Sequence, residues 1–442
     1  MRSYEKEDEE MKKVYWSMSL IVILLLIFDG TGRAVTLRFW TGHGSPDIDK
    51  WFDEVLIPQF EQAHPGVKVE RLRVPWGELN EKIMTAFAAG TAPDIVFSGT
   101  EQIIDEAIKG LARPLNDYIK KWGEYKNFIP MAWKHETIGG KIYRVPIHIS
   151  SRALMYNKTI FKQAGINPNT IPEKWEQIAE LGKKLNLRDD KGNLIRLGAD
   201  LWYTHQFCQG FYYFLYQNKG KIIADDFSKS LFNSEAGVET LQYFVNLFNE
   251  LTPPNLPALP SGPIPNFAAG KIAIYVNTPQ GISDLEKYAP KEFEFGIAFP
   301  FRKSRIIQLY VNGIYITTQS KNPDLAWEFI KFFASSDNLR EFNNTYFTIN
   351  PRKFGAKIDD PFIKQRPLLV AFYEQAQKIG IPYPIIPNYG TLQNRILKDA
   401  IDAALYKKMT PKQALEDAAK KWDASLEELR KEGVFEKILG TK

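Results

Sequence analysis

The sequence predicts an α/β fold in which a sheet of parallel strands is covered by helices. Apolar, β-branched runs alternate along the chain with segments whose apolar residues recur at helical spacing. The chain has 442 residues, a length that suits two or three domains. Its residues are 44% hydrophobic and 25% charged, which is typical of a globular protein with a buried core.

The first quarter of the predicted fold repeats a strand and a helix three times. Apolar runs predict strands at residues 35–40, 67–72 and 94–97. Helical spacing predicts a helix after each strand, at residues 48–63, 77–89 and 101–109. Asp47 is the predicted N-cap of the first helix, and His64-Pro65-Gly66 ends it. Short loops between such units place consecutive strands in one parallel sheet.

A second α/β series follows an apolar extended segment at residues 145–157 and a short amphipathic helix after it. Helices are predicted at residues 174–187, 234–251, 324–334, 391–405 and 411–429. Short strands are predicted at residues 272–276, 295–299 and 311–317. Residues 202–216 are dense in aromatic side chains, and the six prolines of residues 253–265 predict a stiff loop.

The N-terminal segment has the pattern of a secretory signal peptide. Lys12 and Lys13 precede an apolar run at residues 14–28, and Gly32-Arg33-Ala34 brings small residues after it. We expect residues 1–34 to be that signal and the chain to function in the periplasm or at the cell surface. The run is shorter than the roughly 20 residues that span a bilayer, so a retained anchor is the less favoured alternative.

Several classes of function receive no support from composition or motifs. The formal net charge is +5 without long basic runs, so we expect no nucleic-acid partner. Cys208 is the single cysteine, which excludes an intrachain disulfide and lipid attachment at a cysteine after the signal. The five histidines lack metal-ligand spacing, and no Walker, His-Glu-x-x-His or Gly-x-Ser-x-Gly motif occurs. We therefore expect neither a metal nor a cofactor.

Several short motifs occur in one order along the chain. Residues 88–95 read Ala-Ala-Gly-Thr-Ala-Pro-Asp-Ile, and Tyr156-Asn157-Lys158 is followed by Phe161 and Gly165. Further motifs lie at residues 60–69, 175–177, 267–273, 326–329 and 410–415. Together they resemble the extracellular solute-binding proteins of carbohydrate ABC importers, in the cluster of maltose-, trehalose- and glycerol-phosphate-binding proteins. The resemblance covers nearly the whole chain after the signal.

This resemblance implies a periplasmic-binding-protein-like fold with two α/β lobes, a three-segment hinge and a ligand cleft between the lobes. The expected N-terminal lobe comprises residues 35–149 and 311–350. The expected C-terminal lobe comprises residues 150–310 and 351–442. The resemblance further implies a monomer that binds a carbohydrate, meets the membrane permease subunits of the importer and is not an enzyme.

Candidate ligand-binding residues come first from a topological rule. In an open α/β sheet, ligands lie beyond the carboxyl ends of the strands. The loops at those ends hold Trp40, His43, Trp76, Thr100, Glu101 and Asn277. The resemblance implies further contacts at His148, Ser150, Trp202, Asn312, Gly313, Tyr389 and Arg395.

The candidate residues favour a sugar. The apolar face of a pyranose stacks on an aromatic ring, and its hydroxyls need paired donors and acceptors. Related sugar binders often carry carboxylates where this chain has His148-Ile149-Ser150. Glycerol-3-phosphate or a glycerophosphodiester is therefore the alternative ligand. A secreted enzyme acting on glycosides is a less favoured alternative, because no carboxylate pair is marked in the sequence.

Overall fold

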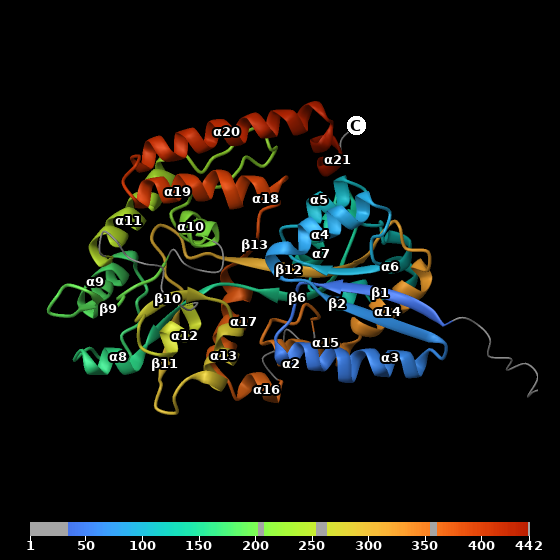
Figure 1. Cartoon of the computed structure of the whole chain (residues 1–442), viewed down its shortest axis with the longest axis horizontal. Coiled ribbons are helices and arrows are strands. Elements are labelled where there is room, and N and C mark those ends of the chain that lie inside the picture. Colours follow the sequence, from blue (N-terminus) through green and yellow to red (C-terminus); the bar gives the residue numbers. More distant parts are fainter. Residues whose placement is uncertain (1–33, 202–206, 253–262, 354–359, 441–442) are drawn as a thin grey trace, which may run out of the picture.

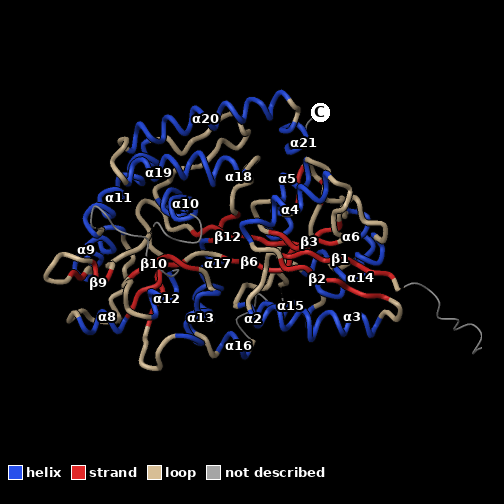
Figure 2. The backbone as a smooth tube through the Cα atoms, in the orientation of Figure 1, coloured by secondary structure: helices blue, strands red, loops and turns tan. Residues whose placement is uncertain are grey.

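The protein forms two groups of elements, each built around its own sheet (Figure 1). The structure, a computed structural model, describes residues 34–201, 207–252, 263–353 and 360–440. Helices lie on the outside of both groups, and the strands of the two larger sheets lie within them (Figure 2). No helix within these ranges is both long and apolar enough to span a bilayer.

The first sheet is mixed, with the order β13-β12-β3-β1-β2 and β6 paired to β12. Its strands are β1 (Val35–Thr41), β2 (Val67–Arg73), β3 (Ile95–Ser98), β6 (Val145–Ser150), β12 (Ile307–Ile316) and β13 (Gly380–Pro382). β1 is parallel to β2 and β3, as the sequence predicts. β12 runs antiparallel to both β3 and β6. The carboxyl ends of β1, β2 and β3 therefore lie at one edge of the sheet. β12, from much later in the sequence, pairs beside β3.

Helices cover both faces of the first sheet. Phe39 of β1 packs against Phe52 of η1 (Trp51–Leu56) and Phe329 of α14 (Pro323–Phe333), with ring centroids 5.5 and 5.4 Å apart. On the opposite face, Val96 packs with Leu79 of α4 (Trp76–Ala88). Alternate strand residues point to opposite faces, so each face needs its own helical layer.

The first predicted helix begins earlier than the sequence indicated. α2 (Pro46–Lys50) continues through η1 into α3 (Ile57–Ala63). The N-cap is Ser45, whose hydroxyl accepts a hydrogen bond from the Ile48 amide, so the prediction of Asp47 as the cap was wrong. Asp47 instead lies in the first turn, where a carboxylate is favoured by the helix dipole.

The second sheet has the order β10-β7-β11 and is antiparallel. Its strands are β7 (Ala153–Asn157), β10 (Ile274–Asn277) and β11 (Phe295–Ala298). The expectation of parallel strands was wrong for these pairs. β7 follows β6 after two residues, so the chain enters this sheet directly from the first one. Asn157 then begins α8 (Lys158–Gln163), because its side chain accepts from the Ile160 amide at 2.9 Å.

Helices surround this second sheet in a thick layer. They include α9 (Trp175–Leu185), α10 (Phe207–Gln217), α11 (Glu235–Leu251), α13 (Gln280–Tyr288), α17 (Pro367–Ile379) and α19 (Lys398–Leu405). α10 is apolar on nearly every side and is buried in the core, as its aromatic density suggests. Residues 263–268 form α12, where the sequence predicted loop, and residues 253–262 of that loop lie outside the described ranges.

Three stretches of chain lie side by side between the two sheets. Ser150 at the end of β6 pairs with Tyr310 of β12, and Ile149 forms a bridge with Ile349. The Ile149 and Ile349 amides exchange hydrogen bonds of 2.8 Å in both directions. Three chain segments thus lie together where the two groups of elements meet.

The C-terminal helices make a separate contact between the two groups. α20 (Pro411–Lys431) begins with a capping box formed by Thr410 and Gln413. α21 (Val434–Leu439) reaches the first group, where the Gly139 amide donates to the Ile438 carbonyl at 2.8 Å. In Figure 1 these helices extend above the second group toward α5 (Ile103–Ile108).

Candidate ligand-binding cleft

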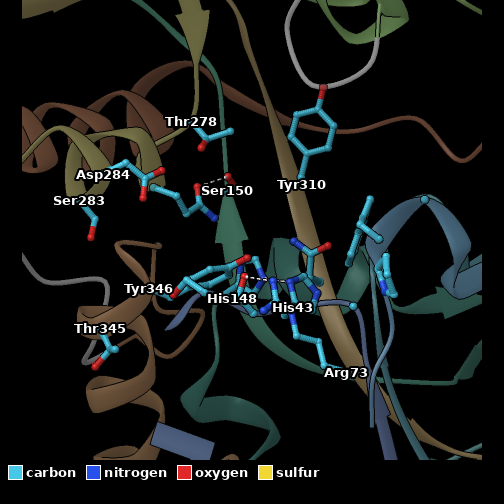
Figure 3. Close-up of a pocket in the computed structure, with 18 of the residues that line it drawn as sticks. His43, Arg73, His148, Ser150, Thr278, Ser283, Asp284, Tyr310, Thr345 and Tyr346 are labelled. Atoms are coloured by element: carbon cyan, nitrogen blue, oxygen red, sulfur yellow. Dashed lines mark hydrogen bonds between the residues drawn. The ribbon is translucent and has the colours of Figure 1, made fainter. Parts of the chain in front are cut away.

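A cavity of about 660 Å³ lies where the two groups of elements meet. Its walls come from the β1–α2 loop, the start of α4, the ends of β3 and β6, α10, α13, β12 and the end of α15 (Ser336–Tyr346). In Figure 3, Ser283 and Asp284 lie on one side of the cavity and Arg73 lies on the other. The volume falls within the range usual for small-molecule sites.

Two histidines meet at the centre of one wall. His148 Nε2 lies 3.4 Å from His43 Nδ1, and both side chains are buried (Figure 3). Burial lowers the pKa of His43 to about 3, with the Ser98 carbonyl raising it and the charge of Arg144 lowering it further. Burial and the neighbouring His43 lower the pKa of His148 well below its usual value. Both imidazoles are therefore neutral at physiological pH. In the contact between them, one ring nitrogen donates and the other accepts.

Trp76 forms an aromatic wall beside this pair. Its ring centroid lies 4.7 Å from that of His43, and the side chain is half-buried. Two glycines make room for the indole. A β-carbon on Gly42 would lie 2.5 Å from Trp76 Cε3, and one on Gly99 would lie 2.3 Å from Trp76 Cζ2. Both glycines stand at the ends of parallel strands, so the topology brings Trp76 to the sheet edge.

A polar line crosses the floor of the cavity. Gln209 Nε2 of α10 donates to Glu101 Oε1 at 3.0 Å, and Arg152 Nη2 donates to Gln209 Oε1 at 2.5 Å. All three side chains are buried. The guanidinium of Arg152 also lies over the ring of Tyr310, 4.3 Å from its centroid. Burial raises the pKa of Glu101, while its own amide and the charge of Arg152 oppose that rise.

A buried ionic cluster holds the loop that carries Glu101. Arg144 Nη1 donates to the Gly99 carbonyl at 2.6 Å and Arg144 Nε donates to Glu136 Oε2 at 2.5 Å. Thr100 adds two hydrogen bonds, from its amide to Asn312 Oδ1 and from its hydroxyl to the Val311 carbonyl. The loop after β3 is thus tied to Arg144, the residue before β6, and to β12, which fixes the position of Glu101.

Ion pairs and hydroxyls surround the cavity mouth. Lys287 of α13 pairs with Asp47 of α2 from the opposite wall. Arg73 pairs with Asp49 at 2.6 Å, and Ser150 Oγ donates to Gln280 Oε1 at 3.3 Å. Lys287 and Asp47 are both partly exposed, so solvent screens the attraction between them.

The structure places six of the thirteen predicted site residues at the cavity and six away from it, and does not describe the remaining one. Six line the cavity: His43, Trp76, Glu101, His148, Ser150 and Asn312. Trp40, Thr100, Asn277, Gly313, Tyr389 and Arg395 do not line it. Trp202 lies outside the described residues.

Each of the six residues off the cavity has a visible role or position. Trp40 packs on the α4 side of the sheet, and Thr100 makes the loop bonds described above. Asn277 Nδ2 donates to Tyr275 Oη at 2.7 Å. A β-carbon on Gly313 would meet Arg144 Cβ at 2.9 Å, so this glycine admits a neighbouring strand. Tyr389 is buried beside Gln209, and Arg395 is exposed on η3 (Leu392–Leu397).

Sequence reasoning missed several residues of the cavity wall. They are Gly44, Ser45, Arg73, Gly77, Arg152, Gln209, Gln280, Ser283, Asp284, Lys287, Tyr310, Thr345 and Tyr346. Arg152 and Gln209 are the most informative of these, because both are polar and buried. Both are polar residues within segments that are otherwise mainly apolar or aromatic, at residues 145–157 and 202–216, but no local pattern places those segments at the cavity.

No group of three or more His, Cys, Asp or Glu side chains within the described residues is arranged to hold a metal ion. What the cavity offers is an aromatic wall, a neutral imidazole pair, amides, hydroxyls and one buried charge of each sign. Such a wall can bind a small polar molecule that has an apolar face.

A two-group α/β fold joined by three adjacent segments, with a polar and aromatic cavity between the groups, defines a solute-binding protein. The chain belongs to the bacterial extracellular solute-binding protein family, whose sequence profile matches residues 44–339. The family is one of extracellular solute-binding proteins, and a solved structure with this fold is a solute-binding protein of an ABC transporter.

Three curated relatives are similar to the chain. It is 26% identical over 419 residues to a Brucella abortus (strain 2308) chain named a binding protein, covering 93% of this chain and 98% of that one. It is 23% identical to the maltotriose-binding protein of Pyrococcus abyssi, covering 85% and 78%. It is also 23% identical to the arabinooligosaccharide-binding protein of Bacillus subtilis, covering 55% and 56%.

Solved structures share the fold. An ABC transporter solute-binding protein of Thermotoga lettingae, bound with alpha-D-tagatose, superposes with a TM-score of 0.77 at 23% identity, covering 89% of this chain and all of that one. A substrate-binding protein of Listeria monocytogenes in complex with cycloalternan gives 0.78 at 20% identity, covering 89% and 99%. The fold is thus periplasmic-binding-protein-like.

Proposed function

We propose that this chain captures a sugar or oligosaccharide outside the cytoplasm and delivers it to the permease of an ABC importer. The observation that carries the proposal is the wall of the cavity. Trp76 and Tyr346 stand beside the buried groups of His148, Glu101 and Asn312. An aromatic ring next to paired donors and acceptors matches the apolar face and hydroxyl rim of a pyranose. The relatives named for oligosaccharides support the same ligand class.

The proposed lobes follow the two sheets except at the crossing, where β13 and the first residues of β12 pair in the first sheet but belong to the C-terminal lobe. The N-terminal lobe comprises residues 35–149 and 311–350, and the C-terminal lobe comprises residues 150–310 and 351–442. The side-by-side arrangement of Ile149, Tyr310 and Ile349 supports a three-segment hinge at these boundaries. Ligand favours the closed form only by binding it more tightly than the open form. Contacts from both walls, such as those of Trp76 and Ser283, would supply that difference.

Closure then presents a surface to the membrane subunits of the importer, with the chain acting as a monomer. The signal-like pattern of residues 1–34 supports export, and the absence of a cysteine there argues against a Cys-anchored lipoprotein. In the proposed function the chain performs no covalent chemistry. Capture, closure and release make up its whole cycle.

A thermal-shift screen of the purified chain tests this proposal. The panel contains mono-, di- and oligosaccharides together with glycerol-3-phosphate and a glycerophosphodiester. We expect a raised Tm with at least one sugar, confirmed by saturable calorimetric binding, and no response to the phosphates. A response to the phosphates alone would replace the sugar by the alternative ligand. Steady hydrolysis of aryl glycosides would overturn the binding role itself.

A further inference from the structure

Two buried charged residues on the cavity floor, Glu101 and Arg152, are joined through the side chain of Gln209. Glu101 comes from the loop after β3, Gln209 from α10 and Arg152 from the segment between β6 and β7. The carboxamide of Gln209 lies between the two charges, donating to Glu101 at 3.0 Å and accepting from Arg152 at 2.5 Å. One buried anion and one buried cation are thus linked through a neutral group.

Arg152 is already engaged by the protein. Nη1 donates to the Ser151 carbonyl at 3.1 Å, Nη2 donates to Gln209, and the guanidinium plane lies over Tyr310. A phosphate or carboxylate ligand is usually bound by both arms of an arginine fork. Here one arm is used by backbone and the other by Gln209, so Arg152 is poorly placed to receive an anion.

The carboxylate of Glu101 favours a neutral ligand and disfavours an anionic one. Its carboxylate accepts hydrogen bonds and can receive a ligand hydroxyl. A ligand anion next to it would face a like charge in a site where water does not screen the repulsion. The other cations at the cavity, Arg73 and Lys287, are paired with Asp49 and Asp47 at the mouth, which reduces their power to offset that repulsion.

We propose that Glu101, held by Gln209 and Arg152, is the specificity-determining residue that makes this cleft select neutral saccharides and reject phosphorylated or carboxylated ones. The inference rests on the proposed function, since it specifies the charge of the sugar. Its central element is the repulsion of anions, which can be measured without knowing the natural sugar.

Inorganic phosphate is the probe for this repulsion. The Tm of the wild-type chain and of Glu101→Gln is measured against increasing phosphate, with chloride replacing phosphate to hold the ionic strength constant. We expect no phosphate-dependent shift in the wild type and a saturable rise in Tm for Glu101→Gln. The double variant Glu101→Gln/Arg152→Gln should lose that rise, because Arg152, although both of its arms are engaged in the wild type, is the buried cation whose charge Glu101→Gln leaves unbalanced.

Asp284→Asn is the matched control, since Asp284 also lines the cavity but lies at its half-exposed rim. It should give no phosphate response. Glu101→Ala removes the same charge and serves if Glu101→Gln does not fold. Equal responses of wild type and Glu101→Gln, or equal gains from Glu101→Gln and Asp284→Asn, would overturn the assignment.

The second measurement is the affinity for a neutral sugar taken from the thermal-shift panel. Glu101→Gln should bind it at least tenfold more weakly, because a charged acceptor becomes a neutral amide. Unchanged affinity would contradict a direct role for Glu101. If the panel contains no sugar that binds the wild type, the proposed function fails, while the phosphate comparison still decides whether Glu101 repels anions.

Discussion

Gly99 lies so close to Trp76 that a β-carbon on the glycine would stand 2.3 Å from Cζ2 of the indole. The contact fixes the aromatic wall of the cavity to the end of β3. Gly99→Ala must therefore displace the Trp76 ring, and we expect a loss of sugar affinity of about tenfold or more, since misplaced binding groups are costly. Calorimetric titration with a sugar that binds the wild type measures this loss.

Gly390→Ala is the control for that substitution, because a β-carbon on Gly390 would meet nothing within 4 Å. Its sugar affinity should equal that of the wild type. If Gly99→Ala also binds as the wild type does, the position of the Trp76 ring is not what determines affinity.

Trp76 itself should account for a large share of the binding free energy. Trp76→Ala removes the aromatic wall, and we expect affinity to fall by at least about tenfold, in keeping with the contribution of aromatic contacts. Trp76→Phe keeps an aromatic face and should lose less. Equal affinities of Trp76→Ala and the wild type, with an unchanged thermal unfolding curve, would remove Trp76 from the site.

The strands and helices up to residue 109 were predictable because each has a local pattern. Strands β1 and β2 alternate in polarity, and α4 has helical spacing, so their ends could be placed within a few residues. The pairing of β12 with β6 was not predictable, since no local pattern specifies which distant strands meet. That pairing is what brings Tyr310 and Asn312 to the cavity.

The candidate site was predictable where it follows parallel strands. His43, Trp76 and Glu101 come directly after strand ends or at a helix start, and all three line the cavity. Gln209 and Arg152 lie inside apolar segments whose position depends on tertiary packing. Tyr346 comes from the end of α15, a helix that the sequence analysis did not predict. These residues reach the cavity only through contacts between distant elements.

The neutral histidine pair should make stability depend on pH. The pKa of His43 is about 3 in the folded chain, against an ordinary value of 6.5. Between these values the unfolded chain binds the proton and the folded chain does not. Stability therefore falls as pH drops below 6.5, by about 1.4 kcal/mol per pH unit for each such histidine.

His43→Gln should reduce the slope of unfolding free energy against pH between 4.5 and 6.5, measured by urea denaturation at constant ionic strength. His64→Gln serves as the substitution control, since it removes a histidine at the end of α3, away from the cavity. Parallel curves for the wild type and His43→Gln would contradict the burial of a neutral His43.

The ion pair between Asp47 and Lys287 should favour the closed form modestly. Lys287→Met should weaken sugar binding by up to about fivefold, because partly exposed pairs contribute about 0.2–1 kcal/mol. The effect should shrink at high salt and act mainly on the dissociation rate, which stopped-flow fluorescence measures. Lys162→Met breaks the surface pair with Glu294 within the C-terminal lobe and should leave binding unchanged. An equal effect of both variants would show that the rim pair has no special role.

Capture by closure is tested most directly by small-angle X-ray scattering of the chain without and with a saturating sugar taken from the thermal-shift panel. Trp76 belongs to the proposed N-terminal lobe and Ser283 to the proposed C-terminal lobe, and both line the cavity, so a ligand that touches both favours the closed form. We expect the radius of gyration to fall on sugar addition, and to fall in the Trp76→Ala chain only at correspondingly higher sugar concentration. An identical radius of gyration in the presence and absence of bound sugar would contradict the account.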